Sequence, residues 1–132
     1  MVLFSRKIIS CNISTKPDVN LIMATFKKTY AKRKQPNRLM FHSVRGYQYT
    51  AFAFRQLLNS LNVLQSFSKK GYPFNNTCCE SFFKYLKKED TNHKTYHSLQ
   101  ELPLSIFEYI KGFYHSKRPH GNLGMLTLNQ KE

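Results

Sequence analysis

The chain has 132 residues, of which 21 are Lys or Arg and 7 are Asp or Glu, so its formal net charge is +14. This length is enough for one domain with a hydrophobic core. No apolar run approaches the roughly 20 residues that a membrane-spanning helix needs. The opening segment carries charges too early for a signal-peptide core. We therefore expect a protein without a membrane partner.

The excess of positive charge is spread along the sequence and is not confined to a tail. A folded, strongly basic surface most often meets nucleic acid and less often an anionic membrane, and a merely basic protein is the third alternative. The cysteines Cys11, Cys78 and Cys79 form no CxxC motif and are odd in number. A reducing cytoplasmic location, in a bacterial cell and near the nucleoid if DNA is bound, is the simplest expectation.

In chain order, the first predicted element is a strand over residues 7–13, which are rich in β-branched side chains. A helix follows over 17–33, since Pro17 and Asp18 suit a first turn and apolar residues then recur on one face. Residues 38–44 read as a second, buried strand.

The next predicted helix has Thr50 as its N-cap, and apolar residues from Phe54 onward recur at helical spacing. A short third strand is predicted over 63–68 and another helix over 77–89.

The last long helix is predicted over 98–113. Ser98 and Glu101 form a capping-box pattern at its start, and Pro103 could shift that start. Strands that alternate with helices indicate an α/β layered domain in which at least part of the sheet is parallel. Three or four strands would make a thin sheet for this class.

The helix over 77–89 presents charged residues on one face. Lys84 and Lys87 follow Glu80 at i+4 and i+7, within one narrow sector, whereas Phe82, Phe83 and Leu86 point toward a core. One interpretation is a solvated helix with an i,i+4 ion pair, which stabilises a helix by only a few tenths of a kcal/mol. The other is a functional carboxylate flanked by two ammonium groups.

Several spaced motifs decide between these interpretations. They are "FHSVRGYQY" at 41–49, "GYPFNN" at 71–76, "ESFFKYLK" at 80–87, and the tail residues Tyr109, Ile110, Arg118, Pro119, His120, Leu123, Gly124 and Thr127. From about Leu3 to Gln130 the sequence resembles the integrase-type catalytic core of insertion-sequence transposases. Asn75 and Leu128 depart from the family pattern, which has Asp and Pro at these positions.

The resemblance implies a ribonuclease-H-like α/β fold in which two Asp and one Glu hold two divalent ions, Mg²⁺ or Mn²⁺. Val44 stands where the family has its second Asp, and Glu80 stands where it has the Glu. Residues 45–79, thirty-five in all, separate the two, which is the family's usual spacing. The first Asp would lie upstream of residue 3. We therefore expect an incomplete core that is truncated at its N-terminus.

In this fold the absent first strand is central, so we expect an incomplete sheet followed by a C-terminal helix. We also expect one partial catalytic-core domain over residues 1–132, with the core at about 3–115 and a basic tail at 116–132. Mg²⁺ is a hard cation that needs anionic oxygen ligands, which valine lacks. We expect Glu80, the remaining catalytic-type and metal-binding carboxylate, to bind metal too weakly for catalysis.

DNA is the partner that the resemblance implies, with no small-molecule substrate. The candidate DNA-binding residues are Lys84, Lys87, Arg45, Lys69, Lys70, Lys117, Arg118 and His120. Tyr47 and Tyr49 could stack on displaced bases, although half-buried packing is the expected role for at least one of them.

Three hypotheses for function remain at this point. The chain could be a core remnant that binds DNA without cutting it, or an active strand-transfer enzyme completed by a separate polypeptide. It could also be a non-enzymatic DNA-binding regulator that mixes with an intact transposase or forms oligomers with itself. All three share the charged face around Glu80, and Val44 counts against the second.

Overall fold

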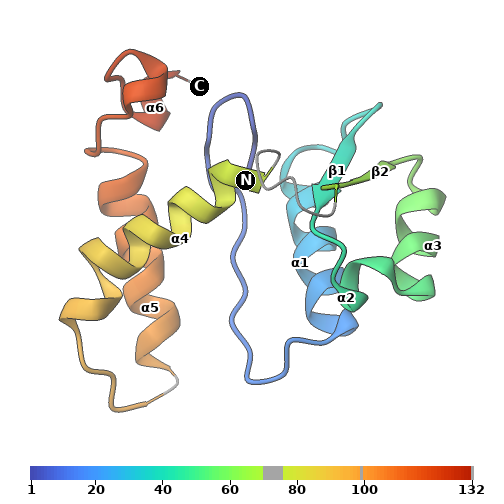
Figure 1. Ribbon diagram of the computed structural model, residues 1–132, viewed down its shortest axis with the longest axis horizontal. Helices are drawn as coiled ribbons and strands as arrows, with labels where there is room; N and C mark the ends of the chain where they lie inside the picture. Colours follow the sequence, from blue (N-terminus) through green and yellow to red (C-terminus); the bar gives the residue numbers. More distant parts are fainter. Residues whose placement is uncertain (70–75, 99, 132) are drawn as a thin grey trace. The chain divides into compact units, whose positions relative to one another are not determined.

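The computed structural model describes residues 1–69, 76–98 and 100–131 (Figure 1). The chain separates into two compact units. One is Ser10–Thr77, and the other combines Met1–Ile9 with Cys78–Glu132. Each unit has its own cluster of buried apolar side chains. That residues 1–132 form a single domain stays a prediction.

The first unit contains three helices and two strands among the residues described. They are α1 (Val19–Lys32), β1 (Met40–Ser43), α2 (Tyr47–Thr50), α3 (Phe52–Ser60) and β2 (Leu64–Phe67) (Figure 1). The two strands pair in parallel, in a register that places Met40 opposite Leu64 and Ser43 opposite Phe67. The predicted parallel pairing is therefore confirmed, and within the described ranges the sheet has two strands.

Helix α1 begins at Val19, two residues after the predicted start, because Asp18 is its N-cap and its Oδ1 accepts a hydrogen bond from the Leu21 backbone N–H at 3.0 Å. The apolar faces of α1 and α3 enclose the core of this unit. Phe54 is fully buried, and its ring lies edge-on to Phe41 and Phe26, with centroids 5.3 and 6.0 Å away. Edge-to-face packing of this kind is favourable for aromatic rings and fixes their orientation.

Two sequence predictions are wrong near this core. Residues 7–13 form no strand. β-branched composition alone does not make a strand, because the backbone groups need a neighbouring strand to pair with. Thr50 ends α2 instead of capping the next helix. Ala51 adopts an extended backbone (φ −58°, ψ 141°), and α3 begins after it at Phe52.

The second unit is helical. Its elements are α4 (Thr77–Glu89), η2 (Thr91–His93), α5 (Glu101–Glu108), the π-helix η3 (Tyr109–Tyr114), the 3₁₀ turn η4 (Gly121–Leu123) and α6 (Leu128–Lys131) (Figure 1). Helix α4 matches its predicted bounds. No helix among the described residues is both long and apolar enough to span a membrane.

The predicted helix over 98–113 is confirmed in part. It begins at Glu101, whose carboxylate accepts a hydrogen bond from the His97 N–H at 2.8 Å, so the capping box at Ser98 does not form. Its last part is the π-helix that directly follows α5. Near its end, His115 is buried and its Nε2 accepts a hydrogen bond from the Ile8 N–H at 3.0 Å. This bond ties the N-terminal segment to the helical unit.

Candidate nucleic-acid interface and active-site turn

The turn after β1 carries Val44, the residue that is expected, from the sequence, at the position of the second family Asp. Strand β1 ends at Ser43, and Val44 follows with 42% of its side chain exposed. Arg45 is also exposed, and its guanidinium carbon lies 5.5 Å from the ring centroid of Phe67, at the end of the neighbouring strand β2. The turn therefore directs residue 44 to the surface at the C-terminal edge of the parallel pair. That edge is where α/β sheets usually place ligand-binding residues.

Several hydrogen bonds hold this turn in place. The hydroxyl of Tyr47 and the amide of Gln48 both donate to the Pro17 carbonyl, at 3.1 and 2.9 Å, and so fasten α2 to the segment before α1. A Cβ at Gly46 would lie 2.9 Å from Gln48 Oε1, so a larger residue there would displace the end of the Gln48 side chain. Tyr49 is half-buried against Phe41, as expected for one of the two tyrosines.

His42 links the ends of the two strands. Its Nδ1 lies 3.1 Å from Ser66 Oγ and its Nε2 lies 3.0 Å from Ser68 Oγ. Both ring nitrogens are therefore occupied by serine hydroxyls. A general base of the Ser-His-Asp kind needs a carboxylate to orient it, and no carboxylate among the described residues contacts His42. The arrangement is structural, because it fixes the strand ends next to Val44.

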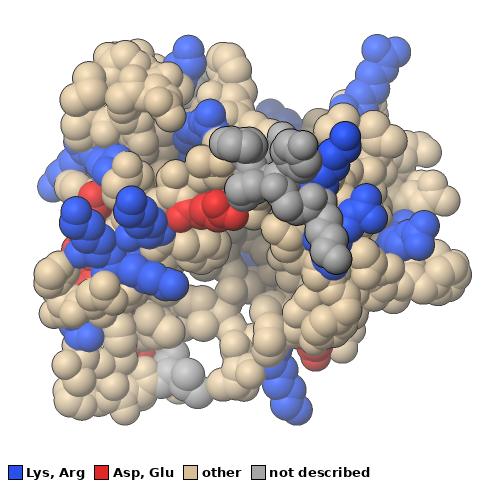
Figure 2. Space-filling model, viewed as in Figure 1, with Lys and Arg blue, Asp and Glu red and all other residues tan. Residues whose placement is uncertain are grey.

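Helix α4 presents the predicted charged face. Glu80, Lys84 and Lys87 are exposed, whereas Phe82 and Leu86 are buried. Figure 2 shows several Lys and Arg side chains close to acidic ones over the region where Figure 1 draws α4. The prediction that Phe83 packs into the core is wrong. Its side chain is 55% exposed because the apolar face of this helix is narrower than the run of aromatics suggested.

Glu80 makes no ion pair or side-chain hydrogen bond to any residue that the structure describes. The interpretation of this face as an i,i+4 ion pair therefore gains no support. The nearest charges in sequence on the same face of the helix are the cations Lys84 and Lys87.

The remaining aspartates have structural roles. Asp18 caps α1, and Asp90 is buried, where it accepts hydrogen bonds from Lys94 Nζ and from Ser105 Oγ at 3.2 Å. Within the described ranges, no three His, Cys, Asp or Glu side chains gather as metal ligands would. Val44 contributes no oxygen, so the residues present do not fit a pair of Mg²⁺ ions, whose ligands are anionic oxygens.

Arg118 is held within the helical unit. Its Nε donates to Glu89 Oε1 at 3.1 Å, and its guanidinium carbon lies 3.8 Å from the ring centroid of Tyr85. The hydroxyl of Tyr109 donates to the same carboxylate at 2.7 Å. Burial, followed by this hydrogen bond, raises the pKa of Tyr109 well above its ordinary value. This arrangement leaves Arg118 less available to an external phosphate than an exposed cation.

His120 is likewise buried, and its Nε2 lies 3.2 Å from the Tyr114 carbonyl oxygen. Burial lowers the pKa of His120; the hydrogen bond to the Tyr114 carbonyl opposes this shift, and nearby Arg118 adds to it. The ring is therefore mostly uncharged at neutral pH. Lys117 and Lys69 are exposed, whereas Lys70 lies outside the described residues.

A second basic region lies outside the predicted site residues. Six exposed cations lie along α1 and the loop after it: Lys27, Lys28, Lys32, Arg33, Lys34 and Arg38. The sequence alone indicates that this region is basic, because no acidic residue lies between positions 19 and 79. From the sequence alone, the end of this run reads only as a basic break between a helix and a strand.

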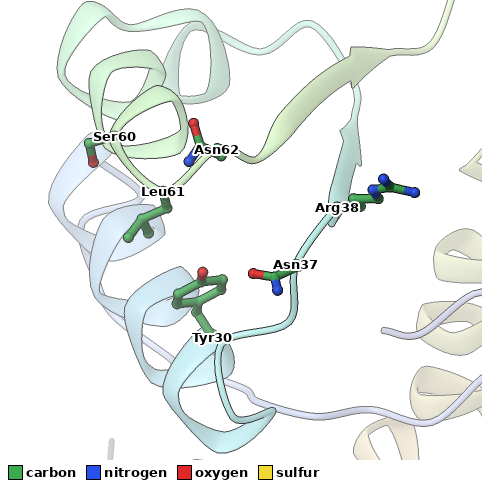
Figure 3. Close-up of a pocket in the computed structure, with 6 residues that line it drawn as sticks. All are labelled: Tyr30, Asn37, Arg38, Ser60, Leu61 and Asn62. Carbon is green, nitrogen blue, oxygen red and sulfur yellow. The ribbon is translucent and has the colours of Figure 1, made fainter.

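A pocket of 450 Å³ opens beside this region, at the N-terminal ends of β1 and β2. It is lined by Tyr30, Asn37, Arg38, Ser60, Leu61 and Asn62 (Figure 3). Asn37 points toward Tyr30 across the pocket, and the Arg38 side chain extends away from it (Figure 3).

Comparison with known proteins shows the family to which the chain belongs. Two family models, both described as an integrase core domain, match residues 1–73 and 61–127. The chain belongs to the integrase core domain family, whose members generally use divalent metal ions and interact with DNA.

The relatives include insertion-sequence transposases. The transposase for insertion sequence element IS904 of Lactococcus lactis is 33% identical over 120 residues, which are 91% of this chain and 47% of that protein. Transposase InsF for insertion sequence IS3A of Escherichia coli is 31% identical over 130 residues, 98% of this chain and 45% of its own. A Lactococcus lactis protein named "ATP-dependent protease" is 47% identical over 107 residues, 80% of this chain and 34% of its own.

The chain thus spans less than half the length of these curated relatives. No solved structure matches it significantly.

Proposed function

We propose that this chain is a remnant of a transposase catalytic core, which binds DNA through its basic surface and does not cut it. The strands β1 and β2 would be part of a ribonuclease-H-like sheet. Its place of action would be the bacterial cytoplasm, where the DNA lies. The main support for the proposal is Val44. This residue directly follows the last residue of β1, is exposed, and offers no side-chain oxygen to a metal ion.

The chemistry of strand transfer explains why this residue matters. In two-metal phosphoryl transfer the ions activate the attacking oxygen and stabilise the leaving one. Mg²⁺ gives up its water reluctantly and binds through anionic oxygens. With valine at the second position, Glu80 is the remaining exposed carboxylate of the pattern, and the charge of the chain, +14, disfavours a further cation. The proposal therefore assigns no metal-dependent step to this chain.

DNA binding does not need those carboxylates. Phosphate contacts need positive charge at the surface, and they are largely independent of sequence. Exposed cations are available at Lys84 and Lys87 on α4, at Lys117, and at Arg45 beside the turn. Arg118 and His120 have partners within their own unit, so they contribute less to this proposal.

Among the described residues, the chain shows neither an ATP-binding motif nor a protease triad that would match the name of the relative called "ATP-dependent protease". The 132 residues contain no Gly-x-x-x-x-Gly-Lys loop of the kind that binds ATP phosphates. The hydrogen-bonded pairs of His42 with Ser66 and Ser68 lack an orienting carboxylate among the described residues. The transposases, in contrast, match 91% and 98% of the chain.

A nicking assay tests the proposal. The purified chain is incubated with a supercoiled plasmid in Mg²⁺ and, separately, in Mn²⁺, and its binding to a labelled duplex is measured in parallel. The expected result is salt-sensitive binding without nicking. Glu80→Gln serves as the matched control, since it keeps the helix and removes the last carboxylate of the site.

The other hypotheses give different results in the same assay. Metal-dependent nicking by the unaltered chain, abolished in Glu80→Gln, would establish an active enzyme and overturn the proposal. Nicking that requires an added polypeptide would identify an enzyme completed in trans. A chain that lowers the activity of an intact relative without cutting DNA would be a regulator, which extends the proposal to a partner protein.

A further inference from the structure

The two units carry very different charge. Residues 10–77 contain eleven Lys and Arg against one acidic residue, Asp18, a net charge of +10 out of the total of +14. Asp18 is itself occupied as the N-cap of α1. The other unit, which carries Glu80 and the lysines of α4, holds ten Lys and Arg against six acidic residues, a net charge of +4. Most of the uncompensated positive charge therefore belongs to the unit that does not carry α4.

Part of this charge is concentrated along one segment, which we call the α1 basic surface. It is defined by Lys28, Lys32, Lys34 and Arg38, four of the six exposed cations of this segment, the others being Lys27 and Arg33. Lys28 and Lys32 are spaced i,i+4 on α1, a spacing at which like charges repel and destabilise a helix. Cations near a helix C-terminus are favourable, which accounts for Lys32. It does not account for Lys34 and Arg38, which lie beyond the helix.

The backbone at the end of α1 gives a second, independent observation. Lys34, Gln35 and Arg38 have φ angles of 56°, 52° and 57°, the left-handed region that glycine adopts freely and other residues disfavour. Lys34 is fixed there by the ordinary hydrogen bonds of a helix end, from its N–H to the Ala31 carbonyl at 3.2 Å and from Gln35 N–H to the Tyr30 carbonyl at 3.1 Å. Glycine is the usual residue at such a position. The chain instead has Lys34 there, followed by the neutral Gln35 in the same conformation, so neither position uses glycine.

Neutral hydrogen-bond donors lie beside one of these cations, Arg38. The pocket at this end of the unit is lined by the Tyr30 hydroxyl and by the amides of Asn37 and Asn62, next to Arg38 (Figure 3). Hydroxyl and amide groups commonly accompany Lys and Arg in contacts to DNA phosphates. The combination of cations, neutral donors and very little opposing acid suits a polyanion better than a protein or a small anion.

We propose that the α1 basic surface is a second duplex-DNA-binding surface of this protein, distinct from the face of α4 and from the turn at Val44. It contacts phosphates and not bases, so it binds without sequence preference. This inference rests on the proposed function, since it requires that the chain bind DNA. It adds that much of the affinity comes from residues outside the catalytic motifs.

Three-charge variants test this assignment by fluorescence anisotropy with a labelled duplex over a range of salt concentrations. The α1 variant is Lys28→Gln, Lys32→Gln, Lys34→Gly, and its matched control is Lys84→Gln, Lys87→Gln, Lys117→Gln. Removal of one phosphate contact lowers the slope of log K against log salt by about 0.9. The slope for the α1 variant is expected to fall by about 2 to 3, and its binding to weaken about tenfold or more at low salt.

The single variant Lys34→Gly separates binding from folding. Glycine fits the left-handed backbone better than lysine, so thermal stability is expected to rise or stay equal while DNA affinity falls. Arg55→Gln removes one exposed charge from α3 of the same unit and is expected to change affinity less than Lys34→Gly. Equal effects of Lys34→Gly and Arg55→Gln would show that only net charge matters and would overturn the assignment.

The remaining outcomes also distinguish the two proposals. If the α1 variant keeps the affinity and salt slope of the unaltered chain while both fall in the α4 control, the second surface does not exist and the proposed function stands. If the unaltered chain binds no duplex at low salt, both proposals fail. Circular dichroism of each variant confirms that the fold is kept.

Discussion

Glu89 accepts a hydrogen bond from Arg118, with Arg118 Nε 3.1 Å from Glu89 Oε1, and this ion pair joins the end of α4 to the segment after the π-helix. The guanidinium also covers the ring of Tyr85 at 3.8 Å. A residue that the sequence motifs suggested for DNA contact thus has an internal role. Arg118 therefore stabilises the helical unit, whereas exposed cations such as Lys84 and Lys117 are accessible to a partner.

Replacement of Arg118 by lysine should therefore weaken the fold more than the binding of DNA. Lysine keeps the charge but lacks the planar group that bonds Glu89 and stacks on Tyr85. The expected decrease is about 1 kcal/mol in the free energy of unfolding, with little change in the salt slope of DNA binding. Chemical denaturation and anisotropy measure the two effects. The exposed neighbour Lys117 provides the contrast, because Lys117→Gln should leave stability unchanged and weaken binding.

The burial of His120 predicts a dependence of stability on pH. Its pKa lies below the ordinary value of 6.5, so the folded state favours the neutral ring and the unfolded state takes up protons more readily. The stabilisation is complete above about pH 6.5 and is lost as the pH falls through the lower pKa of the folded state. Arg118 and Glu89 are the charged groups that act on this ring, with opposite signs.

Thermal melts between about pH 7.5 and pH 5 measure this effect. The variant His120→Asn should show a smaller decrease of stability on acidification than the unaltered chain. His97→Gln, at an exposed position, is the control and should keep the full dependence. An unchanged pH profile in His120→Asn would contradict the assignment.

Two phenylalanines of α3 give a direct test of the core of residues 10–77. Phe54 is 0% exposed and Phe52 is 74% exposed. Phe54→Ala should lower the free energy of unfolding by about 3 to 5 kcal/mol, because it leaves a cavity among Phe26, Phe41 and Tyr49. Phe52→Ala should change it by less than about 0.5 kcal/mol. Similar decreases for both variants would show that α3 packs differently from the arrangement described.

The elements that the sequence predicts well are those whose signal is local. Asp18 marks the start of α1, and the 77–89 helix matches because its apolar residues recur at helical spacing. The strand expected over residues 7–13 is absent because pairing depends on a distant partner that composition does not reveal. The short helix Tyr47–Thr50 also escapes prediction, since Thr50 reads as an N-cap and the apolar spacing begins only at Phe54.

The candidate site residues likewise include some that local sequence predicts and some that it does not. Exposure of Glu80, Lys84 and Lys87 follows from helical periodicity and is predictable. The pairing of Arg118 with Glu89 and the burial of His120 depend on how segments far apart in sequence meet. The α1 basic surface is visible as a charge run, but the exposure of its side chains and the pocket beside Arg38 are seen only in the structure.

The central claim is that one carboxylate at position 80, with valine at position 44, does not hold a pair of divalent ions. Titration of Mn²⁺ into the full chain, followed by electron paramagnetic resonance and calorimetry, measures this directly. We predict no saturable, stoichiometric binding at about millimolar metal, and the same flat titration for Glu80→Gln. Tight binding of Mn²⁺ by the unaltered chain that disappears in Glu80→Gln would contradict the account.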